Sequence, residues 1–122
     1  MSKKVLLVDD SSTIREQVSN VLASYNDLII LEAENGVEAL NVLDQNPDVK
    51  LMLLDVNMPE MDGITVLRRL SMNDKYSSVA IVMLTTEASV DLKNIAKENG
   101  ARAWLLKPFS EVKIQKVVEK LL

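Results

Sequence analysis

Five short apolar runs, separated by longer amphipathic segments, constrain this chain more than any other feature. The runs cover residues 5–8, 28–31, 51–54, 79–84 and 103–106. They are almost continuously apolar, which is typical of strands buried on both faces of a parallel sheet. Strict alternation of strand and helix predicts a doubly wound α/β fold, with a five-stranded parallel sheet between two layers of helices.

Capping residues and glycines set the expected ends of the five helices. In chain order we expect a capping box at Thr13 and Glu16, a start at Asn35 with Glu38, a start after Asp62-Gly63, an end at Gly100 and a start at Ser110. The helix that ends at Gly100 is expected to begin near Ala88 and to bury Leu92 and Ile95. No linker or repeat is visible, so residues 1–122 are expected to form a single domain.

The composition excludes several function classes. The chain has no cysteine and no histidine, so disulfide frameworks, thiolate nucleophiles and histidine-dependent mechanisms are ruled out. No apolar run approaches the roughly 18 residues of a membrane span, and the N-terminus does not resemble a signal peptide. With a net charge of −4, the chain is a poor candidate for nucleic-acid binding. We therefore expect a cytoplasmic protein.

Chemistry-bearing residues follow the apolar runs at the edge where a parallel sheet binds ligands. They are Asp9 and Asp10 after the first run, Asp55 after the third, Thr85 and Thr86 after the fourth and Lys107 after the fifth. Each residue alone is compatible with a cap, a turn or a solvated side chain. Together, three carboxylates in one crevice would repel one another unless a cation neutralised them, and Mg²⁺ is the usual cation at such oxygen sites.

This combination suits phosphoryl chemistry on a carboxylate. A metal ion and Lys107 would neutralise a bound phosphoryl group, and the Thr85 hydroxyl would hydrogen-bond one of its oxygens. An ionised aspartate needs no general base to act as a nucleophile, so the lack of histidine is no obstacle.

The motifs resemble the receiver domains of two-component response regulators, and most of all the single-domain chemotaxis type. The resemblance covers nearly the whole chain and is carried by residues 8–12, 55–63, 84–87 and 100–101, and by Trp104-Leu105-Leu106-Lys107-Pro108-Phe109. It implies a CheY-like, flavodoxin-like sandwich with strand order 2-1-3-4-5.

The resemblance also implies a role for each residue at the site. Asp55 would be the phosphoacceptor, and Lys107 would bind the phosphoryl group. Asp10 would bind Mg²⁺ directly and Asp9 through water, while Asn57 would add its backbone carbonyl. Manganese or calcium is expected to substitute for magnesium in crystals.

Further implied roles concern switching and the lifetime of the phosphate. Thr85 would be the switch hydroxyl, and Trp104 stands where the family usually has a smaller ring that moves with it. Asn57 and Glu87 would tune dephosphorylation. The Lys107–Pro108 peptide is expected to be cis.

The implied function is a phosphorylation-dependent switch rather than an enzyme with an external substrate, although the chain would catalyse phosphoryl transfer to its own Asp55 and the hydrolysis of the resulting phosphate. A sensor histidine kinase would donate the phosphoryl group, and its histidine must come from another protein because this chain has none. The output partner, for which the chemotaxis resemblance suggests a flagellar motor switch, would bind the fourth helix, fifth strand and fifth helix. The protein is expected to be a monomer.

Four alternatives remain at this point. The chain could be the excised receiver of a longer regulator. A small aspartyl-phosphate phosphatase of the haloacid dehalogenase type would need a second aspartate in register after the first strand, and residues 9–13 lack it. An FMN carrier would need a phosphate loop where two aspartates stand. A non-phosphorylated interaction module would be expected to have lost part of the acidic set.

Overall fold

The protein alternates strand and helix along its whole length. The structure, a computed structural model, describes residues 2–87 and 89–122. Its elements are β1 (Lys3–Val8), α1 (Ser12–Leu22), β2 (Leu28–Ala33), α2 (Gly36–Gln45), β3 (Val49–Asp55), α3 (Gly63–Ser71), the short 3₁₀ helix η1 (Asp74–Tyr76), β4 (Ala80–Thr85), α4 (Val90–Glu98), β5 (Ala103–Leu106) and α5 (Glu111–Leu121). All five predicted strands are present, whereas η1 was not predicted. Ala88, expected near the start of α4, lies outside the described residues.

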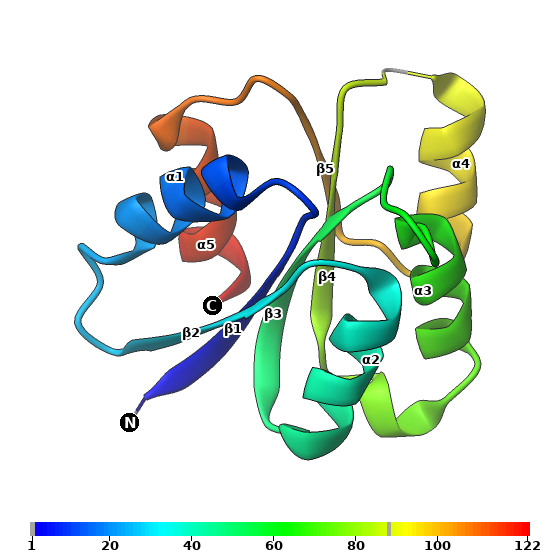
Figure 1. The fold of residues 1–122 in the computed structure, drawn as a ribbon, viewed down its shortest axis with the longest axis horizontal. Helices are drawn as coiled ribbons and strands as arrows, with labels where there is room; N and C mark the ends of the chain where they lie inside the picture. Colours follow the sequence, from blue (N-terminus) through cyan, green and yellow to red (C-terminus); the bar gives the residue numbers. More distant parts are fainter. Residues whose placement is uncertain (1, 88) are drawn as a thin grey trace.

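The five strands form one parallel sheet in the order β2-β1-β3-β4-β5. Helices α1 and α5 cover one face, and α2, α3 and α4 cover the other (Figure 1). The doubly wound fold and its strand order are therefore confirmed. The chain adds β2 on one side of β1 and then β3, β4 and β5 on the other side, so the order of strand addition reverses between β1 and β3. In α/β sheets, ligands bind at the carboxyl ends of the strands beside such a point.

The hydrophobic core consists of two clusters, one on each face of the sheet. The central strands β1, β3 and β4 are almost entirely buried, as their continuous apolar sequences predict. Strand β2 is different, because only Ala33 among its six residues is fully buried. The expectation that every strand is buried on both faces is wrong for β2 and also for β5, in which only Leu105 is buried; these two strands lie at the edges of the sheet.

The helix ends follow the predicted caps with one exception. The side chains of Asn35, Asp62 and Ser110 each accept a hydrogen bond from a backbone N–H of the helix that follows. Gly100 has a φ of +92° just after α4, a conformation that favours glycine. The capping box predicted at Thr13 and Glu16 is wrong, because α1 already begins at Ser12.

The true cap of α1 is Ser11, whose hydroxyl accepts a hydrogen bond from the Ile14 N–H at 3.3 Å. The Ser11 N–H in turn donates to the Asp9 carboxylate at 2.9 Å. This turn immediately after β1 starts the helix two residues earlier than the sequence pattern suggested. Among the helices of the described chain, none is long and apolar enough to cross a membrane.

Candidate phosphoacceptor site

Three carboxylates meet at the carboxyl ends of β1 and β3. Asp55 is the last residue of β3, and Asp9 and Asp10 directly follow β1. Asp9 and Asp55 are buried, with 2% and 3% of their surface exposed, whereas Asp10 is exposed. One carboxylate oxygen from each of the three residues lies within 4.8 Å of the others. The structure thus brings together the acidic residues that the sequence placed at separate strand ends.

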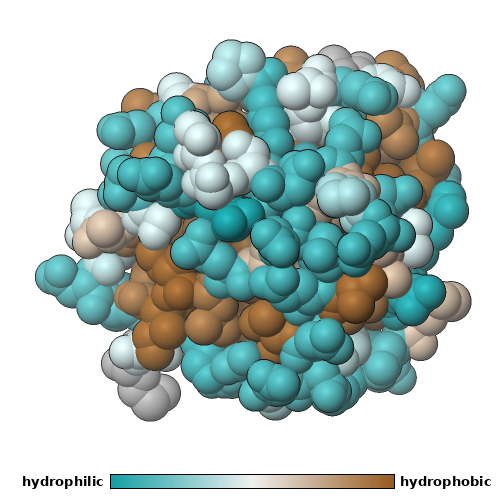
Figure 2. Space-filling model, in the orientation of Figure 1, coloured by the Kyte–Doolittle hydropathy of each residue, from teal (hydrophilic) through white to brown (hydrophobic). Residues whose placement is uncertain are grey.

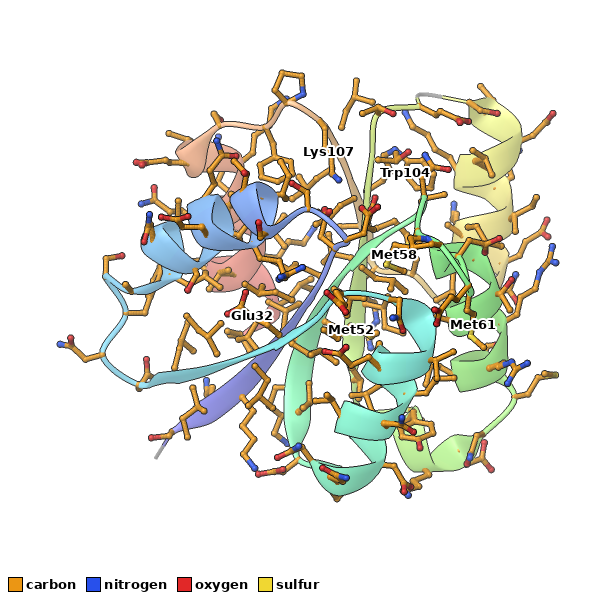
Figure 3. All side chains as sticks on the ribbon, viewed as in Figure 1. Glu32, Met52, Met58, Met61, Trp104 and Lys107 are labelled. Atoms are coloured by element: carbon orange, nitrogen blue, oxygen red, sulfur yellow. The ribbon has the colours of Figure 1, made fainter. Side chains whose placement is uncertain are left out.

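Lys107 supplies the positive charge at this cluster. It follows β5, two strands away from β3, and reaches back across the end of the sheet (Figure 3). Its Nζ donates to Asp9 Oδ2 at 2.6 Å and to Asp55 Oδ1 at 3.2 Å. The lysine side chain is only 14% exposed, so both ion pairs are largely shielded from water. Lys107 therefore bridges the two buried carboxylates.

The surroundings of Asp55 disfavour its ionised form. Burial, together with the nearby Asp9 carboxylate, raises the pKa of Asp55 to about 6, although Lys107 opposes the shift. Burial lowers the pKa of Lys107, but its hydrogen bond to Asp9 and the charges of Asp55 and Asp9 outweigh that effect and raise it. Lys107 therefore remains positively charged, whereas the ionised form of Asp55 is only partly stabilised by it.

Asp9 is held in place by its own neighbours as well as by Lys107. Besides the Ser11 N–H at one carboxylate oxygen, its backbone carbonyl accepts a hydrogen bond from the Arg15 guanidinium. Arg15 also donates through Nε to Glu32 of β2 at 3.1 Å. Sequence reasoning missed Arg15. The available signal was its place in the first turn of the helix that follows the acidic pair.

Thr85 lies at the end of β4 and is completely buried. Its hydroxyl accepts a hydrogen bond from the Glu87 N–H at 3.0 Å, and its carbonyl accepts one from the Lys107 N–H at 2.6 Å. The neighbouring Thr86 is exposed. Thr85 therefore accepts hydrogen bonds from the backbone N–H groups of both Glu87, in the loop before α4, and Lys107.

The loop after Asp55 is shaped by a close contact with the start of α3. A Cβ atom on Gly63 would lie 2.1 Å from the Asp55 carbonyl oxygen, so only glycine fits there. The Gly63 N–H donates to the Val56 carbonyl at 2.9 Å. Within this loop Glu60 has a φ of 67°, a left-handed conformation that costs a residue with a Cβ about 1–2 kcal/mol. The contact fixes the course of the chain that carries Asn57.

Asn57 and Glu87 face a shared depression beside the acidic cluster. Both side chains are exposed, and both line a depression of about 340 Å³ between the start of α3 and the loop before α4. Arg68 of α3 lines the same depression. The two residues expected to tune dephosphorylation therefore lie on one side of the site.

Trp104 lies in β5 on the face of the sheet covered by α4 (Figure 3). It is half-buried and lines a depression of about 270 Å³ together with Lys93, Lys97 and Arg102. Its indole Nε1 is buried and has no hydrogen-bond partner among the described residues. Close by in sequence, the Lys107–Pro108 peptide is cis.

The family model for the response regulator receiver domain matches residues 5–119. The chain belongs to this family. The resemblance inferred from the sequence is thus confirmed. Receiver domains bind Mg²⁺ at an acidic pocket, and Asp9, Asp10 and Asp55 form an acidic group in this chain.

Relatives with similar sequences are chemotaxis proteins. This receiver domain is 38% identical to a chemotaxis protein CheY homolog of Campylobacter jejuni, and the alignment covers 98% of the chain and 92% of that protein. It is 36% identical to chemotaxis protein CheY1 of Helicobacter pylori, over 98% of the chain and 96% of that protein. The chain is a CheY-like response regulator signalling domain.

Solved structures support the same assignment. The chemotaxis protein CheY4 of Vibrio cholerae matches with a TM-score of 0.91 and 36% identity, and each chain is covered completely. A probable two-component system response regulator/GGDEF domain protein matches with a TM-score of 0.87 and 33% identity, and the alignment covers 97% of this chain but 48% of that one. The same receiver fold thus occurs both alone and as part of a longer regulator.

Proposed function

We propose that this receiver domain accepts a phosphoryl group on Asp55 and thereby switches its affinity for an output partner. The observation that carries the proposal is Lys107 bridging Asp9 and Asp55 at a cluster that also includes the Asp10 carboxylate. Lys107 pairs with Asp55 Oδ1, so its positive charge would also stabilise the negative charge of a phosphoryl group transferred to Asp55. Membership of the receiver family supports the same role.

The donor set fits a magnesium ion. Both oxygens of Asp9 already accept hydrogen bonds, from the Ser11 N–H and from Lys107, so Asp9 would reach the metal through water. The exposed Asp10 carboxylate and Asp55 would bind directly, with the Asn57 backbone carbonyl as a further ligand. Burial, and then the Asp9 carboxylate, raise the pKa of Asp55 and so disfavour its ionised form, and a divalent cation bound there would favour it. When bound, the metal would supply Lewis-acid stabilisation of the phosphoryl oxygens.

The transfer itself requires little from the protein beyond positioning. A carboxylate oxygen of Asp55 forms a bond to phosphorus as the bond from phosphorus to the donor atom breaks, and the leaving group takes the electron pair. Lys107 then shifts from the Asp55 carboxylate to a phosphoryl oxygen. The chain contains no histidine, so a phosphohistidine donor would belong to a sensor kinase.

Switching would begin at Thr85. Its hydroxyl now accepts the Glu87 N–H and has its own proton available to donate to a phosphoryl oxygen. Movement of Thr85 toward the phosphate would displace the loop before α4 and alter the depression that Trp104 lines. The face formed by α4, β5 and α5 would then bind the output partner.

Because the relatives named above are chemotaxis proteins, we propose that the output belongs to chemotaxis and that the target is a flagellar motor switch. We further propose that the protein acts in the cytoplasm as a monomer.

Phosphorylation with acetyl phosphate and Mg²⁺, followed by intact-mass spectrometry, tests the proposal. The wild-type chain should gain one phosphate, and Asp55→Asn should gain none. Asp48→Asn, which alters an exposed aspartate paired with Lys4 far from the site, should behave as wild type. An undiminished adduct on Asp55→Asn would refute the assignment of the phosphoacceptor.

Tryptophan fluorescence tests the switch separately. The sequence contains one tryptophan, so the signal belongs to Trp104 alone. Addition of Mg²⁺ and then of beryllofluoride, a phosphoryl mimic, should change the emission in two steps. A Lys107→Ala variant should lose the second step while Lys113→Ala keeps it. A full second step in Lys107→Ala would contradict the role given to that lysine.

A further inference from the structure

The outer edge of β2 is apolar, and no other strand of residues 2–87 and 89–122 lies beside it. β2 is the first strand in the sheet order, so it pairs on one side only, with β1. Its first four residues are Leu28, Ile29, Ile30 and Leu31, none of them fully buried, and Ile29 is 42% exposed. Figure 2 shows an apolar band across the part of the surface where β2 lies, bordered by hydrophilic residues. An edge of this kind is a template for pairing with another strand.

The backbone of β2 presents hydrogen-bonding groups to this edge. The carbonyls of Asp27 and Ala33 accept hydrogen bonds from the Lys3 and Asp9 N–H groups, on the β1 side. Because a parallel ladder engages every second residue of a strand, the intervening residues direct their N–H and C=O groups outward. Leu28, Ile30 and Glu32 therefore offer three donors and three acceptors to an added strand.

The charge around the edge defines what that strand would carry. Three acidic residues, Asp27, Glu32 and Glu34, lie on β2 or directly beside its ends. Two of them, Asp27 and Glu34, are exposed and flank the two ends of β2. Glu32 within the strand already pairs with Arg15. A partner would gain by placing a lysine or arginine near each end of the apolar stretch.

The same charges disfavour a second copy of this chain. Antiparallel pairing of two β2 edges would bring Asp27 of each copy toward Glu32 and Glu34 of the other, and like charges opposite each other destabilise a sheet. We propose that the β2 edge binds an extended, apolar protein segment flanked by basic residues, which adds to the sheet as a sixth strand. This edge contributes none of the three carboxylates or Lys107 of the phosphoacceptor site, although Glu32 near its carboxyl end pairs with Arg15, and it is separate from the face formed by α4, β5 and α5.

The proposal is tested with a synthetic peptide, Lys-Val-Thr-Val-Thr-Val-Lys, titrated into ¹⁵N-labelled protein. We expect chemical-shift changes and slowed hydrogen exchange at the amides of Leu28, Ile30 and Glu32. A peptide methylated at alternate backbone nitrogens and a peptide with glutamate at both ends should each bind on the order of tenfold more weakly, because they lose strand pairing and charge attraction respectively. Equal binding of the methylated peptide, or shifts centred on Trp104 instead, would overturn the proposal.

Two protein variants isolate the backbone contribution. Ile30→Pro removes an outward N–H without breaking a β1–β2 hydrogen bond, and Ile30→Ala removes the same side chain but keeps the N–H. Peptide binding should be lost in the first variant and retained in the second. Equal binding by both would contradict strand addition, and if Ile30→Pro fails to fold, the methylated peptide still decides.

Two further measurements separate the alternatives. Asp27→Asn combined with Glu34→Gln should weaken binding and reduce its salt dependence, whereas Glu111→Gln on α5 should change neither. A peptide-free dimer in sedimentation analysis that disappears in Ile30→Pro would identify a second copy as the occupant and overturn the proposal. Phosphorylation of Asp55 by acetyl phosphate should be the same in the Ile30 variants as in wild type, so this inference and the proposed function can fail independently.

Discussion

Replacing Asp55 by asparagine is expected to stabilise the metal-free fold at neutral pH. Burial and the Asp9 carboxylate raise the pKa of Asp55 from 3.8 to about 6 in the folded protein. The folded state therefore binds a proton between roughly pH 4 and 6 that the unfolded state has already released. As pH rises through this window, the free energy of unfolding falls, and above it the cost of the ionised Asp55 is fully present.

The magnitude follows from the shift. A difference of about two pKa units, at about 1.4 kcal/mol each, corresponds to roughly 3 kcal/mol. Asparagine has nearly the same shape and cannot ionise, so it removes this cost, but its amide is a poorer partner for Lys107 than the carboxylate at 3.2 Å. We therefore expect Asp55→Asn to be more stable than wild type by about 1–3 kcal/mol at pH 7.5, and the difference to shrink toward zero near pH 4.

Urea unfolding in EDTA, followed by circular dichroism from pH 4 to 8, measures the stability difference between the variant and wild type and its dependence on pH. With a slope of roughly 2 kcal/mol per molar urea, the midpoint should differ by about 0.5–1.5 M at pH 7.5. Asp48→Asn is the control, because the pKa of Asp48 is shifted in the opposite direction. The hydrogen bond to Lys4 lowers that pKa, so removing the Asp48 charge should not stabilise the fold. Mg²⁺ at about 100 times its dissociation constant should stabilise wild type by about 3 kcal/mol and so remove the advantage of the variant. A variant less stable than wild type at pH 7.5 without metal, or a difference independent of pH, would refute the reasoning.

Three other substitutions test the loops around the site. Gly63→Ala would place a Cβ 2.1 Å from the Asp55 carbonyl oxygen, so we expect a loss of several kcal/mol, and a urea midpoint within error of wild type would contradict the contact. Glu60→Asn should raise stability by about 0.5–1 kcal/mol, because asparagine tolerates a φ of 67° better than glutamate does, and a destabilised variant would argue against that conformation. Thr85→Ala should still be phosphorylated by acetyl phosphate but lose the fluorescence response to beryllofluoride, while exposed Thr86→Ala keeps it; identical responses would remove Thr85 from the switch.

The sequence predicts the architecture well because its strongest signals are local. Continuous apolar runs mark β1, β3 and β4, and short polar residues mark most helix starts, since both depend on residues close together in the chain. The prediction fails for β2 and β5, whose apolar sequences are the same in kind but whose burial depends on their places at the two edges of the sheet. Edge position is a property of the whole topology, and a single run of residues does not encode it.

The site shows the same division between local and long-range information. Asp9, Asp10 and Asp55 are predictable because strand ends in a parallel sheet share one edge. The bridge that Lys107 makes between Asp9 and Asp55 depends on a side chain that crosses the end of the sheet, and no spacing in the sequence reveals it. The position of Arg15 in the first turn after the acidic pair was an available signal, but its contact with the Asp9 carbonyl appears only in the structure. The need for Gly63 is likewise invisible, because it arises from a backbone contact between β3 and the start of α3.

The bridge made by Lys107 has a consequence for how the protein is made. Its partners Asp9 and Asp55 precede it by 98 and 52 residues, so the bridge joins an early, a middle and a late part of the chain. During synthesis, a chain that has not yet emerged as far as β5 holds the acidic residues but not the cation that compensates them. The two buried carboxylates of a nascent chain therefore lack their cation until Lys107, which directly follows the last strand, has emerged and β5 has joined the sheet.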